Sequence, residues 1–225
     1  NLNETETQLL ENSGSRILEV IKRDDRLDKI ARDIAHHFPR RGFLGKGMVV
    51  SVDKFTAVKM YDKVQHYWVE EKKGLIAERN TARTKEERDK LTAILTYMDK
   101  VDMAVIISEE ADETVKFSKQ GLDITKHRAK MREIVDGVDI EDRFKKADDK
   151  LQLVFVCAMW LTGFDVASLS TLYLDKPMKG HTLMQAIARA NRVYPNKPCG
   201  IIVDYVNVFK YMQKALGQYA SGGDG

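Results

Sequence analysis

Residues 151–205 read LQLVFVCAMWLTGFDVASLSTLYLDKPMKGHTLMQAIARANRVYPNKPCGIIVDY, and this stretch decides the fold. Its first ten residues form a nearly continuous apolar run, which is too short for a membrane span and typical of a strand covered on both faces in a parallel sheet. The run ends in LTGFD, where Gly163 lets the backbone approach a ligand and a carboxylate, Asp165, follows two residues later. Because ligands of such sheets bind beyond the carboxyl ends of the strands, we expect Gly163 and Asp165 to lie at that edge.

The helix predicted over residues 182–193 has one apolar and one polar face. At about 100° per residue, its apolar positions fall on one side. These are Leu183, Ala186, Ile187 and Ala190. Gln185, Arg189 and Arg192 fall within about 60° of one another on the opposite side, along roughly 10 Å of the helix. Two guanidiniums at that separation can grip a phosphate, although the solvated face of any amphipathic helix has the same composition.

Five short apolar runs alternate with helical patterns along the chain. They lie at residues 47–52, 103–107, 152–157, 171–174 and 200–204. This alternation predicts an α/β fold with a mostly parallel central sheet, right-handed crossovers and helices on both faces. We expect residues 26–219 to form this domain, with a charged helical insertion around residues 70–150. Residues 1–25 suggest an approach helix or linker from a preceding domain, and the Gly-rich residues 220–225 a flexible end.

Several local signals place helices. An i, i+3, i+4, i+7 apolar pattern over residues 27–38 predicts an amphipathic helix that ends before Pro39. Asp53 is expected to cap the helix that follows the first strand, and Thr84 with Glu87 forms a capping box for another. Residues 126–150 are highly charged and are predicted to be helical. The basic RRGFLGKG segment lacks the spacing of a phosphate-binding loop, so a turn entering a strand is the preferred interpretation.

Composition indicates a globular protein with 43% hydrophobic and 32% charged residues. The chain has 37 Lys and Arg residues against 34 Asp and Glu residues, so the net charge is small. Any binding of nucleic acid must therefore depend on a local cluster of basic side chains. No apolar run is long enough for a membrane helix and the first residues are polar, so a cytoplasmic location is expected. Cys157 and Cys199 have no metal-ligand spacing, and no metal site is predicted.

Taken together, the TGFD loop, the strand STLYLDKP and the helix QAIARANR resemble the second RecA-like motor domain of superfamily 2 helicases. The sequence of this stretch is similar to that of the restriction (R, or HsdR) subunit of type I restriction-modification enzymes. The resemblance covers about residues 26–209 and is most specific over 151–205. In that family the Gly/Asp loop is the fifth helicase motif, and QxxxRxxR is the sixth.

The resemblance implies roles for the predicted site residues. Asp165 would accept a hydrogen bond from the ATP ribose, and Gly163 would let the backbone pass close to it. Arg189 and Arg192 would reach across a cleft to the γ-phosphate, while Gln185 would orient water or link the arginines to the other motor half. The resemblance places the fourth helicase motif at the first predicted strand and the turn that follows it. Contacts to the DNA backbone are expected from this turn and from the end of the third apolar run. The candidates are Ser51, Lys54 and Thr162, together with Cys157 and Ala158 at the end of the third run.

The chain contains no Walker A sequence, no DEAD-like acidic box after a strand and no recognisable nuclease motif. It is therefore expected not to hydrolyse ATP alone, with ATP and Mg held by a first motor domain. The resemblance implies as partners double-stranded DNA, the first RecA-like domain and nuclease domain of the same subunit, and the modification and specificity subunits. A non-catalytic RecA-like module that docks a partner or binds RNA remains the alternative. A Rossmann-type enzyme is disfavoured because no strand is followed by GxGxxG.

Overall fold

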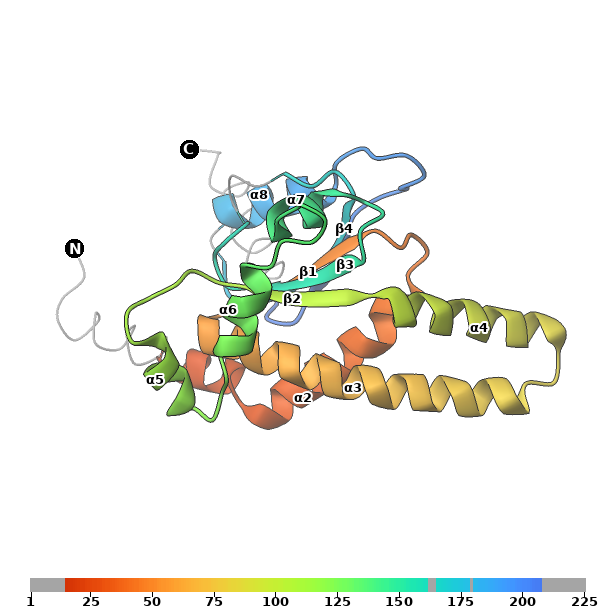
Figure 1. Cartoon of the computed structure of the whole chain (residues 1–225), viewed down its shortest axis with the longest axis horizontal. Coiled ribbons are helices and arrows are strands. Elements are labelled where there is room, and N and C mark those ends of the chain that lie inside the picture. The colour runs from red at the N-terminus through yellow and green to blue at the C-terminus, as the bar shows by residue number, and fades with distance from the viewer. Residues whose placement is uncertain (1–14, 162–164, 179, 208–225) are drawn as a thin grey trace, which may run out of the picture.

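The computed structural model describes residues 15–161, 165–178 and 180–207, and its centre is a five-stranded sheet (Figure 1). The strands lie in the order β2-β3-β1-β4-β5, and every neighbouring pair is parallel. They are β1 (Lys46–Ser51), β2 (Asp102–Ile106), β3 (Leu151–Val156), β4 (Leu169–Asp175) and β5 (Ile201–Asp204). All five predicted strands are present within two residues of their expected bounds, and the α/β fold is confirmed.

Helices cover both faces of the sheet (Figure 1). They are α2 (Asp24–His37), α3 (Lys54–Thr81), α4 (Lys85–Lys100), α5 (Glu113–Ser118), α6 (Thr125–Met131), α7 (Ile140–Lys145) and α8 (Gly180–Ala190), with the short 3-10 helix η1 (Phe38–Arg40) after α2. Successive strand residues point to opposite faces, which produces two separate apolar cores. Val49 and Phe155 belong to the core under α2 and α3. Val50 and Val154 belong to the core under α7 and α8.

The predicted helix caps are present. The Asp53 side chain accepts a hydrogen bond of 2.7 Å from the backbone N–H of Thr56 in the first turn of α3. Thr84 accepts one of 3.1 Å from the N–H of Glu87 at the start of α4. The Glu87 carboxylate returns to the N–H of Arg83, one residue before the position that a capping box uses.

The long hairpin of α3 and α4 is the most extended feature of the molecule (Figure 1). The apolar pattern places α3 against the sheet only as far as Trp68, yet the helix continues to Thr81 and has 28 residues in total. Trp68 fastens the two helices together, because its indole N–H donates to the Met98 carbonyl at 3.3 Å. Beyond it, α3 buries only Leu75, so the outer part of the hairpin has little core of its own.

The prediction that residues 126–150 are helical throughout is wrong. α6 ends at Met131 and α7 begins at Ile140. Between them Val135 and Val138 form an antiparallel bridge. The turn residues Asp136 and Gly137 both have positive φ, at 52° and 77°. An Asp-Gly pair favours this hairpin turn, and that signal outweighed the charged, helix-favouring composition around it.

Candidate functional site

The end of α8 places the predicted arginines at the amino edge of the sheet. The helix starts after the carboxyl end of β4 and must run back, because β5 is parallel to β4 and begins at the opposite edge. α8 ends at Ala190, three residues before the predicted end, so Arg189 lies in its last turn and Arg192 just beyond it. Leu183, Ala186 and Ala190 are buried as predicted, whereas Gln185 and Arg192 are exposed.

Asp165 lies at the same edge as Arg192. The backbone N–H of Lys46, the first residue of β1, donates to the Ser168 carbonyl at 3.0 Å, which fixes the segment after Asp165 beside the start of the sheet. Arg192 Nη1 forms an ion pair with Asp165 Oδ2, and both side chains are about half exposed, at 53% and 52%. Two residues predicted from separate motifs are therefore in contact.

The expectation that Asp165 lies beyond the carboxyl ends of the strands is wrong. The chain leaves β3 at that edge, but it crosses to the amino edge within residues 157–168 in order to enter the parallel strand β4. Asp165 comes near the end of that crossing. Gly163 and Thr162, also predicted as site residues, lie outside the described residues.

The loop of residues 191–200 is anchored at the amino edge. Lys197 Nζ donates to the carbonyl of Leu169 at 2.7 Å and to that of Arg192 at 2.8 Å. Burial lowers the pKa of Lys197. The Tyr194 ring packs edge-on against Phe43, with ring centres 6.2 Å apart. These contacts hold the backbone of Arg192 in place, so its guanidinium projects from a fixed base.

Arg189 is more enclosed than Arg192. Its side chain is partly buried, and its Nε is inaccessible and has no hydrogen-bond partner within the described structure. A buried N–H without a partner costs about 1–3 kcal/mol. The enclosed stem also restricts the conformations that the guanidinium can adopt.

Of the predicted DNA contacts, Ser51, Lys54 and Cys157 lie at the opposite, carboxyl edge. Ser51 ends β1 and is fully buried, and its Oγ has no hydrogen-bond partner in the part of the chain that is described. Lys54 opens α3 and reaches Glu110 at 3.4 Å. Cys157 is buried, which raises the pKa of its thiol, and its carbonyl accepts a hydrogen bond of 2.7 Å from Lys176. At six residues per strand, the two edges are about 20 Å apart.

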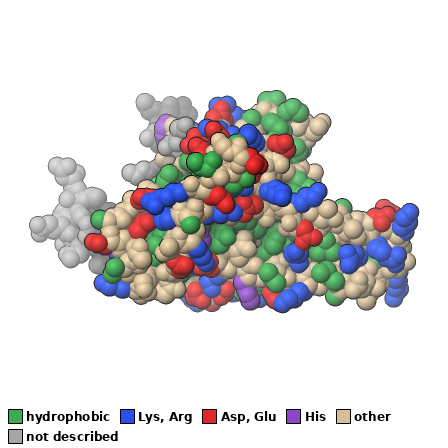
Figure 2. Space-filling view, viewed as in Figure 1, with side chains coloured by type: hydrophobic (Ala, Val, Ile, Leu, Met, Phe, Trp, Pro, Cys, Tyr) green, Lys and Arg blue, Asp and Glu red, His purple; other side chains and the backbone are tan. Residues whose placement is uncertain are grey.

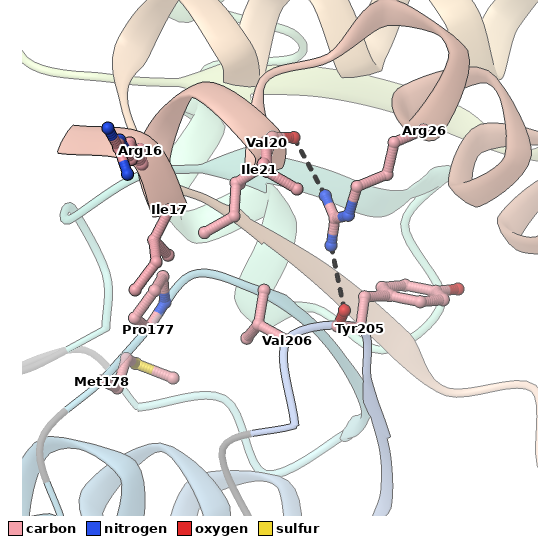
Figure 3. A pocket seen from close by; sticks show the side chains of 9 residues that line it. All are labelled: Arg16, Ile17, Val20, Ile21, Arg26, Pro177, Met178, Tyr205 and Val206. Atoms are coloured by element: carbon pink, nitrogen blue, oxygen red, sulfur yellow. Dashed lines mark hydrogen bonds between the residues drawn. The ribbon is translucent and has the colours of Figure 1, made fainter. Parts of the chain in front are cut away.

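An apolar pocket of about 620 Å³ at the carboxyl edge was not predicted (Figure 3). Ile17, Val20 and Ile21 of the helix at residues 15–21 face Pro177 and Val206 across it (Figure 3). The only sequence signal was the partly apolar pattern of that helix.

Arg26 connects the elements around this pocket. It donates to the Ile21 carbonyl and the Tyr205 carbonyl, each at 2.9 Å, and pairs with Asp175 at 2.6 Å. Asp175 is fully buried at the end of β4, directly beside Ser51 in the strand register. Burial raises the pKa of Asp175, and the neighbouring Arg26 opposes that rise.

The acidic segment after β2 is used in ion pairs. Glu113 pairs with Arg128 at 2.6 Å, and Glu109 pairs with Arg132 at 2.6 Å. Among the residues that the structure describes, no group of three or more His, Cys, Asp or Glu side chains is arranged to hold a metal ion. None of the helices described is both long and apolar enough to cross a bilayer.

The basic residues before β1 also have structural partners. Arg41 is buried and donates to Thr171 Oγ1 at 2.7 Å and to the Gly45 carbonyl at 2.9 Å. Lys46 is fully buried and donates to the Leu151 carbonyl at 2.6 Å. Desolvation lowers the pKa of Lys46 to about 8. The RRGFLGKG segment therefore enters a strand, as preferred, and these two cations are not presented to a phosphate.

Comparison with known proteins gives consistent matches. The family model described as type I restriction enzyme subunit R domain 3 matches residues 46–207. A Methanocaldococcus jannaschii protein, provisionally named as the MjaIXP endonuclease subunit of a type I restriction enzyme, is 32% identical over 209 residues, which is 92% of this chain and 16% of that protein. The HindI endonuclease subunit of a type I restriction enzyme from Haemophilus influenzae is 55% identical over 85 residues, covering 36% of this chain and 8% of that protein.

A solved structure has a similar fold. It is a fragment of a protein from Vibrio vulnificus, provisionally described as the HsdR subunit of a type I restriction enzyme. The match has a TM-score of 0.50 and 14% identity, and covers 87% of this chain and 30% of that one. The chain spans about a sixth or less of the length of the two curated relatives, 16% of the Methanocaldococcus jannaschii protein and 8% of the Haemophilus influenzae protein. Because the family model covers well over half of it, the chain belongs to the family of type I restriction enzyme subunit R, domain 3.

Proposed function

We propose that this chain is the second motor domain of a type I restriction enzyme R subunit and that it completes an ATP site held by a first motor domain. The observation that carries the proposal is the meeting of Asp165 with Arg192 at one edge, with Arg189 in the adjoining turn of α8. These residues come from two motifs that are separated in sequence.

The electrostatics of the Arg192–Asp165 pair suit a residue that changes partner. An exposed ion pair contributes only about 0–1 kcal/mol, so little free energy opposes its opening. A triphosphate offers more negative charge than one carboxylate and matches the planar fork of a guanidinium. In the proposed closed state Arg192 and Arg189 contact the γ-phosphate, and Asp165 is released to the ribose. Gln185, exposed on the same helix, would orient water or contact the other lobe.

DNA would be held at the carboxyl edge by the backbone contacts proposed for Ser51 and Lys54. Thr162 stays a candidate contact, but it lies outside the described residues. Ser51 is buried in the structure, so its contact requires an opening of the edge, whereas Lys54 is only loosely paired. With nucleotide at one edge and DNA at the other, closure on ATP would displace the DNA-holding edge relative to the first lobe. Repeated closure and opening would move duplex DNA through the complex before a separate nuclease domain cleaves it.

The proposal assigns ATP and Mg to the first motor domain, and it makes the isolated chain inactive in hydrolysis. The further partners are the modification subunit and the specificity subunit, and the specificity subunit would recognise the DNA target sequence.

The test uses the full subunit with Arg189→Ala and, separately, Arg192→Ala. ATP hydrolysis and translocation should fall by about 10³ to 10⁵, the range that an arginine at a phosphoryl transition state contributes. Arg192→Lys should retain little ATP hydrolysis or translocation, because an ammonium group lacks the fork geometry of a guanidinium. The matched control is Arg132→Ala, which removes an exposed arginine that also pairs with a carboxylate. Normal turnover in both arginine variants would refute the proposed role.

A non-catalytic module is the second candidate, and the observation that favours it is that Asp165 already neutralises Arg192. Under that hypothesis the pair is structural. Asp165→Ala would then destabilise the loop without affecting ATP affinity, and the full-length sequence would lack a phosphate-binding loop upstream.

A further inference from the structure

The helix at residues 15–21 has an apolar face that no described element covers fully. Ile17, Val20 and Ile21 lie at spacing i, i+3 and i+4, on one side of the helix, and they line the apolar pocket at the carboxyl edge (Figure 3). Ile21 is buried, whereas Ile17 is 53% and Val20 52% exposed. A helix of seven residues is unstable alone in water and depends on the packing of its apolar face. Further apolar side chains are therefore expected to cover Ile17 and Val20.

Apolar side chains on other parts of the surface are more scattered. Figure 2 shows hydrophobic side chains along the α3–α4 hairpin set among charged ones. Isolated apolar side chains of this kind are normal on a protein surface. The carboxyl-edge pocket differs because its apolar side chains are contiguous around a hollow of about 620 Å³. A contiguous apolar hollow is typical of a surface that another element covers.

The carboxyl-edge pocket lies where the two apolar cores of the domain meet. Met178 and Val206 line the pocket and pack against the core under α7 and α8. Tyr205 also lines the pocket and packs against the core under α2 and α3. An apolar segment lying in the pocket would therefore extend both cores at once.

The chain leaves the sheet at the wall of this pocket. Tyr205 and Val206 follow directly after Asp204, the last residue of β5. The Asp204 side chain accepts a hydrogen bond of 3.0 Å from the Val206 backbone N–H, and Asn207 has a positive φ of 57°. These features end the extended strand and turn the chain beside the pocket. Three Cα steps of about 3.8 Å then limit the distance from Val206 to Phe209 to about 11 Å.

Residues 208–219 lie outside the described residues, but their sequence, VFKYMQKALGQY, has the pattern of an amphipathic helix. At about 100° per residue, six apolar side chains fall within about 120° of one another. They are Val208, Phe209, Met212, Ala215, Leu216 and Tyr219. Lys210, Lys214 and Gly217 fall on the opposite side. The sequence therefore predicts a closing helix with one apolar stripe, about 18 Å long.

We propose that residues 208–219 form a helix whose apolar stripe occupies the carboxyl-edge pocket, against Ile17 and Val20. The stripe begins two residues after Val206, which lines the pocket, so no linker has to be crossed. A segment attached this closely has an effective concentration at the pocket in the millimolar range, which favours it over a free partner. The apolar lining of the pocket matches the stripe, while Lys210 and Lys214 face water.

The docked helix would join the two ends of the domain. It would hold the helix at residues 15–21, which precedes α2, against the chain that leaves β5. It would also cover Arg26, which lines the pocket and contacts the carbonyls of Ile21 and Tyr205, and so shield the Arg26–Asp175 pair from water. The inference is independent of the proposed ATP site.

Hydrogen exchange in the full subunit tests the docked helix. Met212→Lys with Leu216→Lys places two charges in the stripe, and the matched control, Gln213→Lys with Gln218→Lys, places two charges outside it. The backbone amides of residues 15–21 should exchange about tenfold faster in the stripe variant, because their apolar cover is lost, and at the wild-type rate in the control. Equal exchange in the two variants would overturn the proposal.

Photo-cross-linking identifies the occupant without disturbing the stripe. A photoreactive side chain replaces Arg16, which lines the pocket, and in the control it replaces Leu18 on another side of the same helix. Mass spectrometry of the full subunit then locates the linked peptide. The probe at position 16 should label residues 208–219, and the probe at position 18 should label them at least about tenfold less, because two residues turn a helix by about 200°.

Each other product of the cross-linking would assign the pocket to a different occupant. Labelling of residues 1–14 would assign it to the segment before the helix, and labelling between two subunits would assign it to a second copy. Labelling of another domain of the same subunit would assign it to that domain. Any of these results, or no product at all, would overturn the proposal. ATP hydrolysis is not a readout here, so normal turnover in Arg192→Ala would refute the arginine role and leave the docked helix unaffected.

Discussion

Arg26→Met should destabilise the fold strongly. Asp175 is fully buried and Arg26 is its cationic partner at 2.6 Å, so the substitution leaves a buried carboxylate without compensation. Removing one member of a buried ion pair costs about 3–5 kcal/mol, a large part of the ~5–15 kcal/mol by which a typical domain is stable. The variant also loses the hydrogen bonds to the carbonyls of Ile21 and Tyr205, which should loosen the walls of the carboxyl-edge pocket.

The loss should depend on pH with a defined sign. Burial already raises the pKa of Asp175, and Arg26 is the group that opposes the rise, so the pKa should rise further in Arg26→Met. A carboxyl whose folded pKa is raised binds more protons in the native state, and stability then falls as pH increases through the window above 3.8. The variant should therefore recover part of its stability as pH is lowered from 7 towards 5.

Urea unfolding followed by circular dichroism at several pH values measures both effects. Arg26→Met combined with Asp175→Asn should be more stable than Arg26→Met alone at pH 7, because the uncompensated charge is gone. The interaction free energy follows from the double-mutant cycle. A loss below about 0.5 kcal/mol, the range of ordinary surface substitutions, or a loss that is independent of pH would refute the reasoning.

Other substitutions test the packing, the caps and a buried lysine. Gly47→Ala should destabilise by about 1–3 kcal/mol, because its Cβ would lie 2.3 Å from the Phe38 ring, whereas Gly74→Ala, with open space in α3, should stabilise by about 0.5–1 kcal/mol. Both changes are read from urea midpoints, and equal shifts in the same direction would contradict the packing argument. Thr84→Ala should cost about 1 kcal/mol by removing the cap of α4, with faster amide exchange in the first turn of that helix. The stability of wild type should rise from pH 8 towards 10.5, because the Lys46 pKa is lowered from 10.5 to about 8 and the unfolded chain binds the extra proton. Lys46→Met should lack that component of the rise.

The fold was largely predictable from periodicity. Apolar runs such as residues 151–156 are typical of central strands of a parallel sheet, and the spacing of Leu27, Ile30 and Ile34 is typical of a helix that packs against a core. What periodicity did not predict was the length of α3. Its outer half is polar on most sides, and its helical state depends on the partner helix α4 and on internal propensity.

The candidate site was predicted as a set of residues but not as a place. The sequence by itself predicted Asp165 and Arg192 as candidate site residues, because a Gly/Asp loop and a helix face with two arginines are local features of the chain. Only the tertiary structure decided which edge they occupy. Parallel strands force each crossing segment to return to the amino edge, so the loop before β4 and the end of α8 meet there, about 20 Å from Ser51 at the carboxyl edge.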